Sequence, residues 1–287
     1  RDCGWRGAHP SRVGILCSSG VGVGMPSLGR RYVPDPRDFP IERIHVDHAA
    51  VSLPPSVLWA DKVVLDQGDF GTCIGNGWAG WGDSLPIADT YSEADARAIY
   101  YEATCIDGQC DTSYQNGSTV RSGAKAMQNR KRLASYAFLT TLDTIREWLA
   151  NHGPIVFGSD WTNDMFTPDA LGFVKPTGGV AGGHCFLCIG YDTSTDSFRF
   201  RNSWGSGWGL SGDFLLKSAD VTTLLAGIDD PGEACAAAEL LETPPTPAPP
   251  SPTPPAPPNP TPMPDFAERL LHAIEKALRD VFKEFFG

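Results

Sequence analysis

Thirteen of the 22 residues from 243 to 264 are proline. Such a segment cannot form a packed core, because proline lacks a backbone amide hydrogen and favours an extended polyproline II helix. The compact fold must therefore lie earlier in the chain, and we interpret residues 241–264 as a Pro-rich linker. With 287 residues in total, the part before the linker is long enough for one enzyme-sized domain.

The segment after the linker, residues 265–287, has the pattern of an amphipathic helix. Its apolar residues recur at helical spacing on one stripe, opposite a face of mixed charge. We interpret it as a docking or self-association helix. A membrane-surface role is the alternative, which the mixed charge of the polar face disfavours. The apolar stripe consists of Phe266, Leu270, Ile274, Leu278, Val281 and Phe285.

The first 52 residues are interpreted as an N-terminal extension, and residues 53–240 as the main domain. Several prolines punctuate the extension and favour an extended arm. Residues 1–24 carry little pattern and precede Met25, which reads as a natural start, so we expect them not to be native.

Within the main domain the hydrophobic period changes near Pro154. Segments 91–103, 118–130 and 141–153 carry apolar residues at helical spacing, the first behind a Ser-x-x-Asp capping pattern. After Pro154, short β-rich segments alternate with turns of Gly, Asp, Ser and Thr. The sequence therefore predicts an α+β protein with a helical lobe and an antiparallel β lobe, and a cleft between lobes is a natural place for a site.

The charge and the cysteines limit the classes of function. With 23 basic and 34 acidic residues, the net charge of -11 argues against nucleic acid or an anionic membrane as the main partner. No apolar run is long enough to span a bilayer and no signal-peptide pattern begins the chain, so we expect an intracellular or phage-associated protein. Eight cysteines are too few for a disulfide scaffold. Whether Cys105 and Cys110 form a bridge is left open, and Cys185 and Cys188 read as core residues.

One cysteine stands in unusual surroundings. Cys73 follows a Gly-rich turn in "DQGDFGTC", where exposed amides and close backbone approach suit a reactive thiol. If Cys73 begins a helix, the helix N-terminus favours a thiolate, and the side-chain amide of Gln67 can add a donor for an oxyanion.

Of the six histidines, His184 is the best candidate for the partner base. It follows Gly183 in "GGHCFLCIGYD", at the mouth of a predicted strand, where glycine allows close approach of a substrate. Asn202 lies on the next predicted strand and can hold the second ring nitrogen. Trp204 can cover that hydrogen bond from water. His152 reads instead as the end of a helix.

These residues resemble the catalytic motifs of the papain-like cysteine peptidases. The likeness runs from about Leu53 to Lys217, and "NSWGSGWG" is its most specific stretch. The resemblance implies a papain-like two-lobe fold, Cys73 as nucleophile, His184 as base and acid, Asn202 as orienting residue and Gln67 as oxyanion donor. It also implies substrate contacts at four further residues, Gly117, Ser118, Gly183 and Trp204.

The sequence departs from the family pattern at several points. Ile74 follows the nucleophile where a tryptophan is common, and Phe70 stands where many members carry a disulfide cysteine, which favours a bacterial or phage-like branch. The arm of residues 25–52 is too short for the long helical inhibitory propeptide of the lysosomal and plant enzymes. Autoinhibition by that device is not expected.

Taken together, the sequence predicts a cysteine endopeptidase that needs no cofactor or metal and acts on a peptide or protein. The alternatives are a cell-wall peptide hydrolase or processing factor with the same triad, and an inactive papain-like binding module. Two further local patterns have a simpler interpretation than a functional site. His45 and His48 are expected to be solvated rather than metal ligands, and the glycosylation sequon at Asn116 is expected to be a turn.

Overall fold

The computed structural model describes residues 26–36, 38, 53–60 and 62–239. The expected linker, the expected terminal helix, residues 1–24 and the two histidines at 45 and 48 lie outside the described residues.

Helices dominate the first part of the domain and strands the second. None of the described helices is long and apolar enough to cross a bilayer. The elements in chain order are β1 (Ser56–Leu58), α1 (Cys73–Asp83), α2 (Glu93–Ile106), α3 (Val120–Asn129), β2 (Leu133–Leu139), α4 (Leu142–Asn151), β3 (Ile155–Thr162), the 3-10 helix η2 (Asn163–Phe166), β4 (Val180–Asp192), β5 (Ser197–Arg201), β6 (Asp213–Lys217), α5 (Ser218–Ala226) and β7 (Glu233–Glu239).

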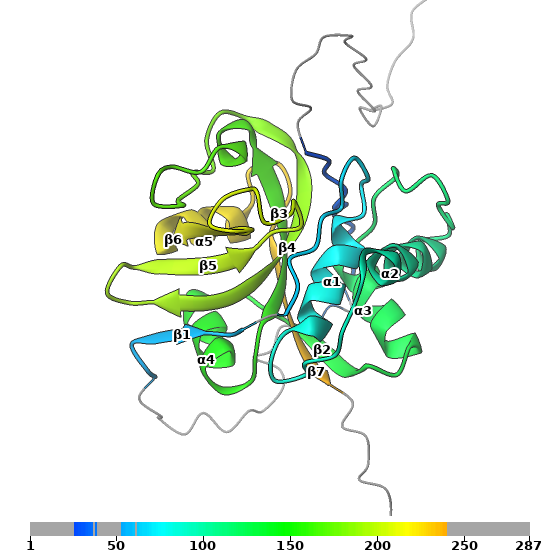
Figure 1. Ribbon diagram of the computed structural model, residues 1–287, viewed down its shortest axis with the longest axis horizontal. Coiled ribbons are helices and arrows are strands. Elements are labelled where there is room, and N and C mark those ends of the chain that lie inside the picture. Colours follow the sequence, from blue (N-terminus) through cyan, green and yellow to red (C-terminus); the bar gives the residue numbers. More distant parts are fainter. Residues whose placement is uncertain (1–25, 37, 39–52, 61, 240–287) are drawn as a thin grey trace, which may run out of the picture. The chain divides into compact units, whose positions relative to one another are not determined.

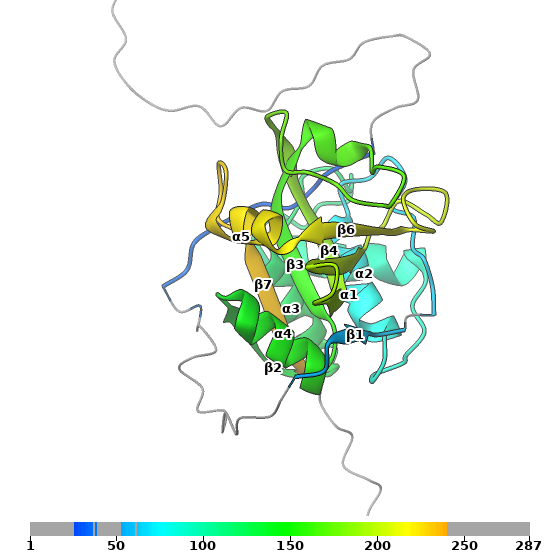
Figure 2. The ribbon, with the colours of Figure 1, turned by 90° about the vertical axis from the view of Figure 1, so that its left-hand side faces the viewer.

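The strands form one antiparallel sheet in the order β2-β7-β3-β4-β5-β6, with β1 added against β4. Helices α1, α2 and α3 lie on one side of β3 and β4, and α4 and α5 lie on the other (Figures 1 and 2). The α+β prediction with a helical lobe and an antiparallel β lobe is confirmed.

Strand β4 is buried on both faces, and its alternation divides the core in two. Cys185 and Leu187 pack into the core formed with α1, α2 and α3. Phe186 and Cys188 pack into the core of the β lobe. Because successive side chains of a strand point to opposite faces, one strand serves both lobes. The interpretation of Cys185 and Cys188 as core residues is confirmed, since both are almost fully buried.

Helix α1 forms despite four glycines that disfavour a helix. A Cβ on Gly75 would overlap the carbonyl oxygen of Ala96 on α2, and a Cβ on Gly77 would come 2.7 Å from the sulfur of Cys185. Tertiary packing therefore requires these glycines, because they let α1 lie directly on α2 and β4.

Two strands are missing from the sequence prediction. β2 follows α3 in the part expected to be helical, and β7 comes after the last expected strand. The sequence of β7, "EACAAAE", favours a helix in isolation. It is a strand because β7 pairs with β2 on one side and β3 on the other.

The cysteines of the helical lobe settle a question that the sequence left open. Cys105 and Cys110 form a disulfide at the end of α2.

Asn116 is exposed in the following loop, where its backbone amide donates to the carboxylate of Asp111.

We expect Gly75→Ala to lower the free energy of unfolding by about 1–3 kcal/mol, because the new methyl group must displace α2 from α1. Gly207→Ala is the matched control, since nothing lies within 4 Å of a Cβ at Gly207. Urea denaturation of both variants measures the difference. Equal stabilities would show that the contact between α1 and α2 is loose.

Candidate active site

Helix α1 begins at Cys73, so the thiol lies at the positive end of the helix dipole. The thiol is fully buried. The backbone of Ile74, of Cys185 on β4 and of Gly29 in the N-terminal arm lies close enough to lower the pKa of the thiol. The last two contacts come from segments far apart in the sequence, and Cys185 directly follows His184.

His184 is held in one orientation by Asn202. The ring nitrogen Nε2 lies 2.8 Å from Oδ1 of Asn202, and the backbone amide of Ser203 donates to the same Oδ1 over 2.8 Å. An atom that accepts from a backbone amide is an oxygen, so Nε2 of His184 must be the donor. Nδ1 is then the nitrogen that can take a proton. It is buried and has no hydrogen-bond partner among the described residues.

Aromatic rings enclose the pair of His184 and Asn202. The ring of Trp204 stacks on His184, with centroids 4.8 Å apart, and Trp161 meets His184 edge-on at 5.0 Å. His184 and Asn202 are therefore nearly excluded from water. A hydrogen bond in such surroundings is stronger than one in water.

The loop before α1 is tied to the loop that carries Asn202. The hydroxyl of Ser203 donates to Oε1 of Gln67 over 2.6 Å. The backbone amide of Gln67 donates to the backbone carbonyl of Ser203. This arrangement leaves the Nε2 amide of Gln67 as a donor. It donates to the carbonyls of Ser27 at 2.9 Å and Phe70 at 2.7 Å.

A segment of the N-terminal arm lies across these residues, and we call residues 27–31 the covering segment. Figure 1 draws this part of the chain in dark blue, beside the start of α1. Its Ser27 carbonyl accepts from Gln67, and its Gly29 backbone lies close enough to the Cys73 thiol to lower the pKa of that thiol. The arm was expected to be a separate extension, and nothing in its sequence indicated this contact.

Three residues expected to contact substrate instead contact the covering segment. The amides of Gly29 and Arg30 both donate to the carbonyl of Gly183. Ser118 donates to the carbonyl of Gly29 and accepts from the amide of Arg31. Gly117 has a left-handed backbone, and a Cβ there would overlap the carbonyl oxygen of Gly29.

The covering segment completes a dry environment in which neither Cys73 nor His184 is charged. Burial raises the pKa of the Cys73 thiol to about 12, although its backbone hydrogen bonds and the charge of Arg30 oppose the rise. Burial lowers the pKa of His184 to about 4, against the effect of its hydrogen bond to Asn202. Both shifts follow from the cost of placing an ion in a low-dielectric interior.

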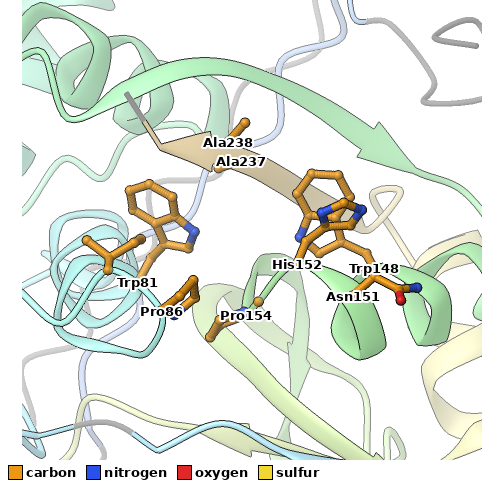
Figure 3. A pocket seen from close by; sticks show the side chains of 10 residues that line it. Trp81, Pro86, Trp148, Asn151, His152, Pro154, Ala237 and Ala238 are labelled. Carbon is orange, nitrogen blue, oxygen red and sulfur yellow. The ribbon is translucent and has the colours of Figure 1, made fainter. Parts of the chain in front are cut away.

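Another pocket of the domain, shown in Figure 3, is separate from this site. It has a volume of about 270 Å³ and is lined by the rings of Trp81, Trp148 and His152. Trp81 follows Cys73 by eight residues on α1, which places the pocket about 12 Å further along the helix axis. His152 ends α4, as expected from the sequence, and its ring lies 4.4 Å from that of Trp148.

The described residues contain no group of three or more His, Cys, Asp or Glu that could hold a metal.

We expect the stability advantage of the wild type over His184→Gln to shrink as the pH falls from 6.5 to 4. In this range the unfolded chain protonates His184, whose ordinary pKa is 6.5, while the folded chain does not. The unfolded state is therefore favoured by up to about 3 kcal/mol at pH 4. Urea denaturation of both proteins at several pH values measures the change, and a constant difference would contradict a buried, neutral His184.

Comparison with known proteins finds a family that part of the chain resembles. Residues 88–226, slightly under half of the chain, match the family model described as papain family cysteine protease. The matched range includes His184 and Asn202 and begins after Gln67 and Cys73.

Two curated relatives cover similar parts of the chain. Cathepsin B of Dictyostelium discoideum is 26% identical over 173 residues, which cover 56% of this chain and 53% of that protein. An uncharacterized peptidase C1-like protein of Acanthamoeba polyphaga mimivirus is 33% identical over 207 residues, covering 53% of this chain and 63% of that protein. The chain therefore spans between half and two thirds of the length of these relatives.

The fold has a counterpart among solved structures. Xylellain, a cysteine protease from Xylella fastidiosa, superimposes with a TM-score of 0.59 at 21% identity, covering 74% of this chain and 96% of xylellain. The family match and the common fold agree with the resemblance read from the sequence motifs, without singling out a bacterial or phage-like branch. Over residues 88–226, this chain matches the papain family of cysteine proteases.

Proposed function

We propose that this chain is a cysteine endopeptidase that hydrolyses peptide bonds through Cys73, His184 and Asn202, with Gln67 as oxyanion donor. The observation that carries the proposal is the covering segment. A short stretch of this chain lies beside the thiol, with one carbonyl on Gln67 and backbone hydrogen bonds to Gly183 and Ser118. Groups that bind this internal peptide can bind the backbone of a substrate.

The proposed reaction begins when the covering segment leaves and a substrate takes its place. The Cys73 thiol passes its proton to Nδ1 of His184, and the sulfur attacks the carbonyl carbon of the scissile bond. Asn202 holds the ring through Nε2 while the imidazolium exists. Nε2 of Gln67 donates to the oxygen that becomes negative.

The second half of the reaction restores the enzyme. The imidazolium of His184 gives its proton to the leaving amine, which breaks the carbon–nitrogen bond and leaves an acyl group on Cys73. A water molecule then gives a proton to His184 and attacks the acyl carbon. The carbon–sulfur bond breaks, the acid product leaves, and the proton returns to the thiol.

Two alternatives share parts of this site. A cell-wall peptide hydrolase would use the same residues, and turnover of purified peptidoglycan without turnover of soluble peptides would favour it. An inactive binding module would keep the fold alone. It is disfavoured because Asn202 already fixes the tautomer that a base requires. Docking to a partner or self-association through residues 265–287 is a further proposal, tested by the assembly state after their removal.

We expect Cys73→Ala to reduce peptide hydrolysis by about 10³-fold or more, because the nucleophile is lost. Cys188→Ala is the matched control, since Cys188 is equally buried but packs in the β-lobe core. Hydrolysis of a mixed fluorogenic peptide set under reducing conditions measures both. Turnover retained by the Cys73 variant would place the nucleophile elsewhere.

We expect Leu28→Asp to increase the rate at which an epoxysuccinyl probe labels Cys73. Leu28 packs against Gly182 and the β-lobe core, so a carboxylate there should expel the covering segment. Leu171→Asp is the control for the same change at a side chain that is 71% exposed. Intact-mass labelling follows the adduct. Equal labelling rates in the two variants would show that the covering segment does not limit access to the thiol.

A further inference from the structure

A buried phenol holds the backbone that pairs with the covering segment. Ser118 is fully buried. Its amide donates to the carbonyl of Gly29 over 2.9 Å, and its carbonyl accepts from the amide of Arg31 over 2.7 Å. The amide of the preceding residue, Gly117, donates instead to the hydroxyl oxygen of Tyr100 over 2.9 Å. Tyr100 lies on α2 and is also fully buried, so this hydroxyl ties the peptide-pairing backbone to the helical lobe.

Asp111 fixes the orientation of that hydroxyl. The hydroxyl of Tyr100 donates to Oδ2 of Asp111 over 2.6 Å. Burial and this hydrogen bond raise the pKa of the Tyr100 phenol, so the phenol keeps its proton. The proton is directed to Asp111, and the lone pairs of the phenol oxygen remain to accept from the amide of Gly117. The carboxylate, the phenol and the amide therefore form one chain of hydrogen bonds.

Asp111 also folds the loop that follows it. Its carboxylate accepts from the backbone amides of Ser113 at 2.8 Å and of Gln115 and Asn116 at 2.9 Å. Burial opposes the charged form, but hydrogen bonds from Ser113 and Tyr100 hold the pKa of Asp111 below its ordinary range. Both carboxylate oxygens are used in this way, so a side chain with one oxygen cannot replace them.

The same loop lies against the segment that leads to the thiol. The amide of Gly71 donates to the carbonyl of Tyr114 over 2.8 Å, and Nε2 of Gln115 donates to the carbonyl of Asp69 over 3.1 Å. Gly71 precedes Cys73 by two residues. The loop therefore connects the backbone that pairs with the covering segment to the segment that carries the candidate nucleophile.

We propose that Tyr100 and Asp111 are positioning residues for a peptide substrate, which hold the backbone of Gly117 and Ser118 at the place where the substrate pairs with it beside Cys73. The proposal rests on the proposed peptidase function and adds two residues to it. Both act through Gly117, because Tyr100 accepts from its amide and Asp111 accepts from Tyr100.

A purely structural role for these two residues makes a different prediction. Loss of the Tyr100 hydroxyl would then lower the stability of the domain and leave the use of peptides by the open site unchanged. Positioning requires more. A reaction that depends on the peptide backbone must slow down relative to a reaction that depends on the thiol alone.

The test uses the full chain with Tyr100→Phe, which leaves the buried amide of Gly117 without its acceptor. Cys73 is labelled with a peptidyl epoxysuccinyl probe and, separately, with iodoacetamide, which carries no peptide chain. Intact mass gives both second-order rates, and the Cys73→Ala chain identifies adducts on other thiols. Both reactions require that the covering segment leave, so the ratio of the two rates cancels the fraction of open chain. The ratio of probe to iodoacetamide should fall about 5-fold or more.

Tyr191→Phe is the matched control. The ring of Tyr191 is nearly buried in the β lobe, and its hydroxyl donates to the carbonyl of Pro54 over 2.8 Å. This variant loses one hydrogen bond of the same kind, and its ratio should equal that of the wild type. Equal ratios in Tyr100→Phe, Tyr191→Phe and the wild type overturn the proposal. If Tyr100→Phe does not fold, Asp111→Asn decides in its place, because its ratio should fall as well.

Turnover of fluorogenic peptides by the wild type separates this proposal from the proposed chemistry. Turnover with an unchanged labelling ratio in the variants would support the peptidase and overturn the role of Tyr100 and Asp111. A lowered ratio without any turnover by the wild type would support the positioning of a bound peptide and overturn the peptidase. An unchanged ratio without turnover would overturn both.

Discussion

The thiol of Cys73 and the imidazole of His184 are both held away from water, and the rest of the site depends on this exclusion. In the covered form burial keeps both groups neutral, with pKa values of about 12 and about 4. The free-energy cost of a thiolate–imidazolium pair falls only when solvent or a polar substrate enters. The hydrogen bond from His184 to Asn202 and the stacked ring of Trp204 keep the His184 ring in position meanwhile.

The covering segment connects this electrostatic state to recognition. Its backbone uses Gly183 and Ser118, its Ser27 carbonyl uses Gln67, and its Arg30 side chain uses Glu233. One short peptide therefore engages backbone, oxyanion and side-chain features together. These five residues contact Gly183 on β4, Ser118 before α3 and Gln67 before α1.

The sequence motifs predicted the candidate site residues, and local patterns predicted most helices. Cys73, His184, Asn202 and Gln67 could be found because each is a reactive or polar residue in a Gly-rich or strand-edge context. The strands β2 and β7 could not, because an alanine-rich segment becomes a strand only through its neighbours in the sheet. Arg30 and Glu233 are 203 residues apart and belong to no local pattern. A basic residue in the arm and an acidic residue after α5 acquire meaning only when the fold joins them.

The central claim is that the covering segment occupies the place of a substrate over Cys73. The most direct measurement is a crystal structure of the full chain after reaction with a peptidyl epoxysuccinyl probe. The account predicts a bond from the probe to the sulfur of Cys73, probe backbone hydrogen bonds to Gly183 and Ser118, and a covering segment displaced from both. A probe attached while residues 27–31 keep their hydrogen bonds to Gly183 and Ser118, or attached to another thiol, would contradict it.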